Sequence, residues 1–100
     1  MIFDLAAAKQ HLRIEHGDED AYVTALCEAA EQQFNNYTGR VLYERQSNLA
    51  EAPENALNLS SDIEAGAWVL IGALYENREH GDGLPLPTKL LWDPYRWLAV

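Results

Sequence analysis

A ten-residue stretch that would be apolar on nearly every side of a helix most constrains how this chain can fold. Ala65 to Leu74 carries only glycine and apolar side chains, inside a helical pattern that opens at Ser61 and closes near Glu79, before Gly81. A helix without a polar face must be enclosed by other protein, in its own chain or in a neighbour. With 100 residues, the chain has room for a single domain with a thin core.

The start and the interior of this helix carry two further signals. Ser61 and Glu64 have the spacing of a capping box, in which Ser61 caps the helix and the Glu64 side chain reaches back to the cap. Gly66 and Gly72 each weaken a helix interior by about 1 kcal/mol relative to alanine. The two glycines would offset this cost if their lack of a side chain lets another helix approach closely.

A second long helix is predicted from Asp18 to Thr38. Acidic side chains at its start suit a helix N-terminus, and Gly39 is well placed as the left-handed residue after its last turn. Apolar and aromatic side chains recur along it at helical spacing: Tyr22, Val23, Leu26, Cys27, Ala30, Phe34 and Tyr37. Because the two long helices carry matched apolar stripes, we expect them to pack together as the core.

The other predicted elements are short. Asp4 to Arg13 predicts a helix that Asp4 caps, and Thr88 to Trp92 predicts a last helical turn. Val41 to Tyr43 is typical of a short strand or an extended segment, and residues 44–58 contain the proline and asparagines of a loop. The sequence therefore predicts one mainly all-α domain of residues 1–100. It has two long antiparallel helices, short N- and C-terminal helices, and an irregular or short β segment in the middle.

Charge excludes several classes of partner. Sixteen acidic residues against seven Lys and Arg give a net charge of −9, which is unsuited to gripping nucleic acid phosphates or an anionic membrane surface. Nothing near the start looks like a signal peptide, so we expect none, and the longest apolar run is about half a membrane span. The single cysteine, Cys27, excludes an intrachain disulfide and a Cys-rich zinc module, and we expect it in the core. We expect a soluble protein in a reducing compartment.

The residues that could carry chemistry are few. His11 and Glu15 have the spacing of two metal ligands on one helix face, but the helix ends there and no second ligand pair follows. His16 with Asp18 could form an acid–base pair, although a loop histidine beside a capping carboxylate is much commoner. We therefore predict no catalytic residue, no cofactor and no metal. An enzyme subunit or metal-binding domain that uses His11, Glu15 and His16 is left as the alternative.

The end of the chain is rich in residues that favour protein contacts. Leu84 to Val100 follows a glycine- and proline-rich linker and carries more apolar surface than an end segment should leave in water. Trp, Tyr and Arg dominate the energies of protein interfaces. We predict that 84–100 is a docking tail outside the central core, and the alternative is that it folds back over its own helices. The candidate interaction residues are Trp92, Tyr95, Arg96, Trp97 and Leu98.

Several pieces of the sequence occur together in the order and spacing of a known family. They are Leu5 to Ile14, His16 to Asp20, Leu26 to Ala30, Asn36 to Gly39, Ala73 to Glu79, Leu84-Pro85 and Leu90 to Arg96. In these pieces the chain resembles the small head–tail connector (adaptor) proteins of long-tailed phages and prophages, also called phage DNA-packaging connector proteins. The segment from Leu42 to Asn58 contributes nothing to the resemblance.

The resemblance implies a structural protein without cofactor or catalytic residues. It implies a mostly helical subunit that forms a cyclic homo-oligomer beneath the portal protein. The ring would join the portal to stopper or tail-completion proteins at the head–tail junction of the virion, after assembly in the bacterial cytoplasm. DNA would only pass through the channel, and acidic side chains lining it would repel phosphates. A small helical protein-interaction module or regulator, without enzymatic activity, remains the alternative.

Overall fold

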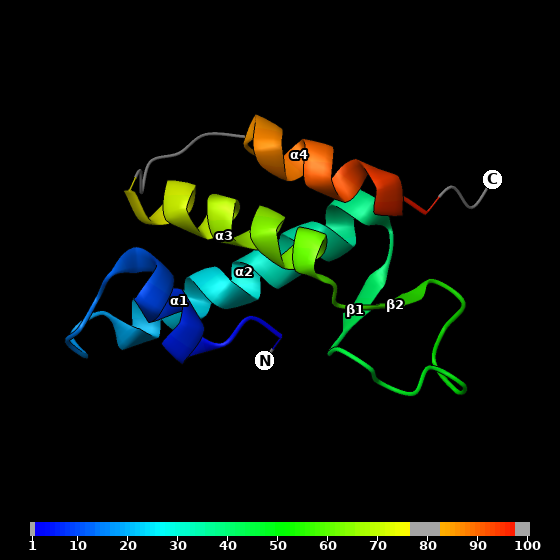
Figure 1. Ribbon diagram of the computed structural model, residues 1–100, viewed down its shortest axis with the longest axis horizontal. Coiled ribbons are helices and arrows are strands. Elements are labelled where there is room, and N and C mark those ends of the chain that lie inside the picture. Colours follow the sequence, from blue (N-terminus) through cyan, green and yellow to red (C-terminus); the bar gives the residue numbers. More distant parts are fainter. Residues whose placement is uncertain (1, 77–82, 98–100) are drawn as a thin grey trace.

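The helix predicted to be enclosed lies at the centre of the structure. The computed structural model describes residues 2–76 and 83–97. In it, α3 (Ser61–Glu76) packs against α1 (Leu5–Leu12), α2 (Asp20–Thr38) and α4 (Leu86–Trp92), as Figure 1 shows. These three helices cover one side of the apolar stretch, whereas Ala65 and Val69, which is 37% exposed, lie at the surface, so the chain encloses this helix only in part. The part of the predicted helix beyond Glu76 lies outside the described residues.

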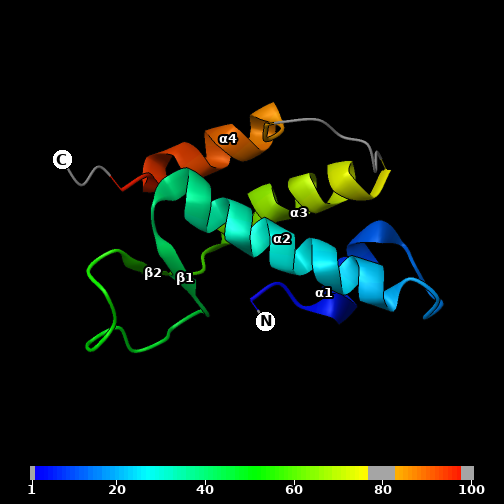
Figure 2. The same ribbon diagram turned by 180° about the vertical axis from the view of Figure 1, so that it is seen from behind.

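The two long helices form the core, as their matched stripes predict. Figures 1 and 2 show α2 and α3 side by side and running in opposite directions, with α4 above them. The mainly helical class, with two long antiparallel helices and a short β segment, is confirmed. The buried apolar residues form one cluster: Phe3, Ala8, Val23, Leu26, Cys27, Ala30, Phe34, Leu42, Leu59, Ile63, Ala67, Leu70, Ile71 and Trp92.

The helix ends confirm some of the predicted caps and shift others. Asp4 caps α1, because its Oδ2 accepts a hydrogen bond from Ala7 N at 3.1 Å. Gly39 ends α2 in the left-handed region at φ 72°. Arg13, predicted inside the first helix, instead follows it in the left-handed region at φ 59°. α2 begins at Asp20, two residues later than predicted, with Glu19 before it.

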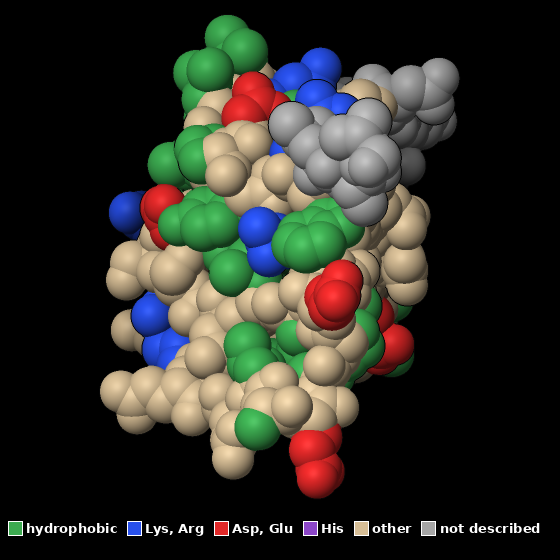
Figure 3. All heavy atoms as spheres, turned by 90° about the vertical axis from the view of Figure 1, so that its right-hand side faces the viewer, with side chains coloured by type: hydrophobic (Ala, Val, Ile, Leu, Met, Phe, Trp, Pro, Cys, Tyr) green, Lys and Arg blue, Asp and Glu red, His purple; other side chains and the backbone are tan. Residues whose placement is uncertain are grey.

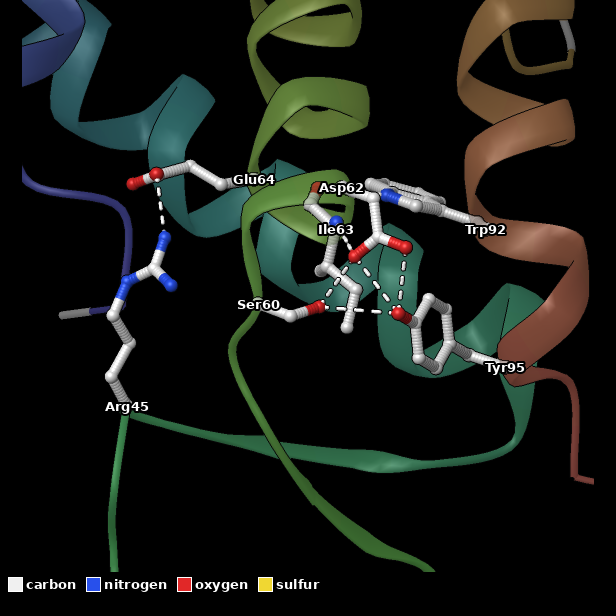
Figure 4. A network of polar contacts seen from close by, with 7 residues as sticks. All are labelled: Arg45, Ser60, Asp62, Ile63, Glu64, Trp92 and Tyr95. Atoms are coloured by element: carbon white, nitrogen blue, oxygen red, sulfur yellow. Dashed lines mark hydrogen bonds and ion pairs between the residues drawn. The ribbon is translucent and has the colours of Figure 1, made fainter.

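The predicted capping box at the start of α3 is wrong. The residue before the helix is Ser60, whose carbonyl oxygen accepts the hydrogen bond from Glu64 N at 2.9 Å. The Glu64 side chain does not reach back, because its Oε1 binds Arg45 Nη2 at 2.9 Å (Figure 4). The Glu64 carboxylate, which its spacing from Ser61 assigned to the cap, instead pairs with Arg45, a residue distant in the sequence. This ion pair connects the segment after β1 to α3.

A second strand appears in the segment predicted to be a loop. β1 (Val41–Tyr43) forms where a strand was predicted, and β2 (Ala56–Asn58) pairs with it in parallel, with Leu42 opposite Leu57. Leu59 N extends the pairing by donating to Tyr43 O at 2.8 Å. Parallel strands need a long crossover connection, and residues 44–55 provide it. The three residues of β2 carry no alternating pattern that would have predicted a strand.

The prediction that 84–100 lies outside the core is wrong for α4. Trp92 is completely buried, and its Nε1 donates to Ile63 O at 2.9 Å. Thr88 is also buried and donates from Oγ1 to Gly66 O at 2.8 Å. Because Gly66 has no side chain, Trp92 of α4 can pack directly on α3 at this position. α4 therefore folds back over the helices of the same chain.

Candidate protein-interaction surface

The end of the molecule where α2 meets the C-terminal segment gathers aromatic and arginine side chains. We name the surface formed by Tyr37, Arg40, Tyr95, Arg96 and Trp97 the aromatic–arginine end. Seen end-on in Figure 3, Lys and Arg side chains lie among hydrophobic ones on this side of the molecule. Arg96 is exposed and the other four side chains are partly exposed. All five are therefore accessible to a partner.

Backbone contacts fix the C-terminal segment against the end of α2. After α4, the short 3-10 helix η1 (Asp93–Tyr95) turns the chain towards Gly39. Trp97 N then donates to Thr38 O at 2.6 Å. A Cβ at Gly39 would lie 3.6 Å from the Cβ of Trp97, so the two segments pass in van der Waals contact. The positions of the side chains at this end are thus set by ordered backbone on both sides.

Each arginine at this end lies over an aromatic ring. The Arg40 guanidinium is 5.0 Å from the centre of the Trp97 ring, and its Nε donates to Tyr95 O at 2.7 Å. The Arg96 guanidinium is 5.2 Å from the centre of the Tyr37 ring. Neither guanidinium forms an ion pair with a carboxylate among residues 2–76 and 83–97. Both cations therefore keep hydrogen-bonding capacity for a partner.

Two tyrosine hydroxyls tie the same end to carboxylates. The Tyr37 hydroxyl donates to Asp93, and this hydrogen bond raises the pKa of Tyr37 above its ordinary value. The Tyr95 hydroxyl donates to both carboxylate oxygens of Asp62, at 2.8 and 2.7 Å (Figure 4). Ser60 Oγ also donates to Asp62, at 2.6 Å. The hydrogen bond from Ser60, and to a smaller extent that from Tyr95, lowers the pKa of Asp62, because both stabilise its ionised form.

The structure sorts the candidate interaction residues into three groups. Tyr95, Arg96 and Trp97 come together at the aromatic–arginine end. Trp92 does not join them, because it is buried between α3 and α2, with its ring 5.1 Å from that of Phe34. Leu98 lies outside the described residues. Sequence reasoning missed Arg40, and its position directly after the helix-ending Gly39 is the one signal that could have indicated it. It also missed Tyr37, which it counted only in the apolar stripe of the second long helix.

The two histidines considered for chemistry, His11 and His16, make separate contacts. His11 stacks on the Trp68 ring at 5.6 Å, and His16 Nδ1 lies 3.9 Å from Asp18 Oδ2 with both side chains mostly exposed. Within the described ranges, no group of three or more His, Cys, Asp and Glu side chains could hold a metal ion. Burial raises the pKa of the Cys27 thiol to about 11, which keeps it protonated at neutral pH and poorly reactive.

Comparison with known proteins supplies the family. Residues 2–82 match the family described as "Phage gp6-like head-tail connector protein". The chain belongs to this family. Its role is therefore structural, at the connection between the head and the tail of a phage. No curated protein and no solved structure matches the chain. None of the helices in the described part of this connector is long and apolar enough to cross a membrane.

The family match does not extend over the whole connector. It includes the segment 42–58, which contributed nothing to the resemblance seen in the sequence, and it ends at residue 82. α4, η1 and three of the five residues of the aromatic–arginine end (Tyr95, Arg96 and Trp97) lie beyond that limit. The pieces Leu84-Pro85 and Leu90 to Arg96 therefore lie outside the match.

Proposed function

We propose that this connector forms a ring between the portal protein and the stopper or tail-completion proteins, and that the aromatic–arginine end binds the portal. Membership of the head-tail connector family supports the place in the virion. The pair of arginines stacked on half-exposed rings supports the choice of surface. Arg, Tyr and Trp are the residues that most often dominate binding energy at protein interfaces.

Preorganisation supports the same assignment. Binding costs the entropy of each side chain that must be ordered at the interface. Here Arg40 is already held by the Tyr95 carbonyl and the Trp97 ring, and the Tyr95 hydroxyl is held by Asp62. A partner that supplies carboxylate or carbonyl oxygens would gain charge-assisted hydrogen bonds without that cost.

The charge of the connector supports a passive relation to DNA. A net charge of −9 gives each subunit a negative field, and carboxylates facing a channel would repel the phosphates of DNA that moves through it. We therefore propose that DNA passes through the ring without specific binding. The protein would act in the virion, after assembly in the host cytoplasm, and without enzymatic activity.

The test is binding of the purified connector to the portal protein of the same phage. Arg40→Ala and Arg96→Ala should each weaken portal binding by about tenfold or more, as expected for interface hot spots. The matched control is Arg13→Asn, which removes one exposed arginine near the other end of α2 and suits the left-handed backbone there. Equal binding by all three variants and the wild type would refute the assignment of this surface.

Ring formation is tested separately. Light scattering after size-exclusion chromatography, with electron microscopy of the same fractions, should show a closed oligomer of the wild type, alone or on the portal. A wild-type chain that neither assembles nor binds the portal would overturn the proposed function as a whole.

A further inference from the structure

α4 has a second apolar face that points away from its own core. Leu86 and Leu90 are 67% and 63% exposed, the highest values for large apolar side chains in the described part of the chain. They are four residues apart and therefore share one side of the helix, opposite Thr88 and Trp92. Two adjacent leucines this exposed form a small apolar patch that a partner could cover.

Lys89 gives this face a charge. It is exposed, and it forms no ion pair with a carboxylate among residues 2–76 and 83–97. The face thus combines a leucine pair with a cation that pairs with no carboxylate of the described residues, and it suits a partner surface with a hollow and a negative charge.

Such a surface exists on the outer side of α2. A hollow of about 560 Å³ is lined by Glu28, Ala29, Glu31 and Gln32. Glu28 is exposed and has no cationic partner among the described residues, whereas Glu31 Oε1 accepts a hydrogen bond from Ile2 N at 3.4 Å. The hollow is therefore acidic, and the small side chain of Ala29 leaves room for a larger apolar group.

The two surfaces belong to different helices of one molecule, α4 and α2. Figure 2 shows α2 in front of α3, with α4 along the upper edge. One copy can therefore offer its α4 to one neighbour and its α2 hollow to another. A contact between two different surfaces of identical chains is heterologous, and it repeats around a ring when the rotation closes.

We propose that α4 of one copy docks on the α2 hollow of a second copy. In this contact Leu86 and Leu90 cover the Ala29 region, and Lys89 pairs with Glu28 of the neighbouring copy. The proposal rests on the ring of the proposed function and names the surfaces through which the subunits meet. It uses an element beyond residue 82, where the family match ends.

A charge exchange tests the contact in the full chain. Lys89→Glu and Glu28→Lys should each raise the midpoint concentration of assembly about tenfold, because each places like charges together. The double variant restores opposite charges at every contact, and its midpoint should return to within about threefold of the wild type. A matched exchange, Lys89→Glu with Glu54→Lys, keeps the net charge but should not restore assembly, since Glu54 lies outside the hollow.

The leucine pair is tested independently. Leu86→Gln with Leu90→Gln should abolish assembly while the melting temperature of the dissociated chain stays unchanged. A fall in that melting temperature would mean that the chain covers these leucines itself, and the proposal would be wrong. Assembly of every variant at the wild-type midpoint, alone or on the portal, would also overturn the contact but leave the ring intact. A wild type that stays monomeric at all concentrations, both alone and with the portal present, would overturn the contact together with the ring.

Discussion

Gly66→Ala adds a single methyl group at the closest approach of α3 and α4. A Cβ at this position would lie 2.6 Å from Trp92 Nε1, 3.0 Å from its Cδ1 and 3.2 Å from its Cε2. All three atoms belong to one rigid ring, which is completely buried and therefore cannot swing aside. Gly72→Ala is the matched control in the same helix, because its Cβ would meet His11 Nε2 at 3.6 Å, an ordinary contact distance.

The two substitutions should change stability in opposite directions. Alanine in place of glycine stabilises a helix interior by about 1 kcal/mol, and Gly72→Ala should gain up to that amount. At Gly66 the forced shift of Trp92 costs about 1–3 kcal/mol. Loss of the hydrogen bond from Trp92 Nε1 to Ile63 O leaves a buried donor unpaired, for about 1–3 kcal/mol more. After the helix gain is subtracted, Gly66→Ala should lower the free energy of unfolding by about 1–5 kcal/mol.

Urea unfolding of the dissociated chain, followed by circular dichroism and tryptophan fluorescence, measures both changes. In a domain of this size, 1 kcal/mol corresponds to a shift in melting temperature of about 4–8 °C. Trp92→Phe removes Nε1, the atom closest to the added methyl, so Gly66→Ala should cost less in that background. If Gly66→Ala stabilises the chain as Gly72→Ala does, the packing of Trp92 on Gly66 is refuted.

Three further predictions concern the core, the start of α3 and the buried thiol. Leu26→Ala should lower the free energy of unfolding by about 2–5 kcal/mol, since Leu26 is only 7% exposed, and near-wild-type urea unfolding would contradict its place in the core. Ser60→Ala should raise the pKa of Asp62 towards its ordinary value, which NMR titration measures. Ionised Asp62 stabilises the fold at pH values above its ordinary pKa, and this stability is lost as the pH falls through the lowered pKa of the folded state. The same substitution should therefore reduce this contribution to stability. Ser61→Ala should leave the pKa of Asp62 unchanged, because Ser61 is exposed and does not bind that carboxylate. The raised pKa of Cys27 means that the protonated thiol favours the fold, so the stability it contributes should be complete below pH 9.0 and be lost as the pH rises to about 11. Cys27→Ala should flatten that part of the stability profile, and an unchanged slope would show that other groups cause it.

Local patterns in the sequence were enough to place the helices. The periodic stripe that ends at Gly39 and the cap at Asp4 depend on residues within a few positions of one another, and these signals survive folding unchanged. The apolar stretch in α3 predicted enclosure because a helix of that composition has no stable place in water. The family resemblance also followed from such pieces, and the family match confirmed it.

Contacts between distant residues decided the rest. The Glu64 carboxylate, four residues from Ser60, binds Arg45 across 19 residues, and β2 exists because it pairs with β1. Nothing local distinguishes Trp92 from Trp97, yet one is buried against Gly66 and the other is partly exposed beside Arg40. The sequence alone determined that residues 84–100 carry several large aromatic rings. Which ring fills the core and which one faces a partner depends on the space left when α4 packs on α3, and only the tertiary structure fixes that space.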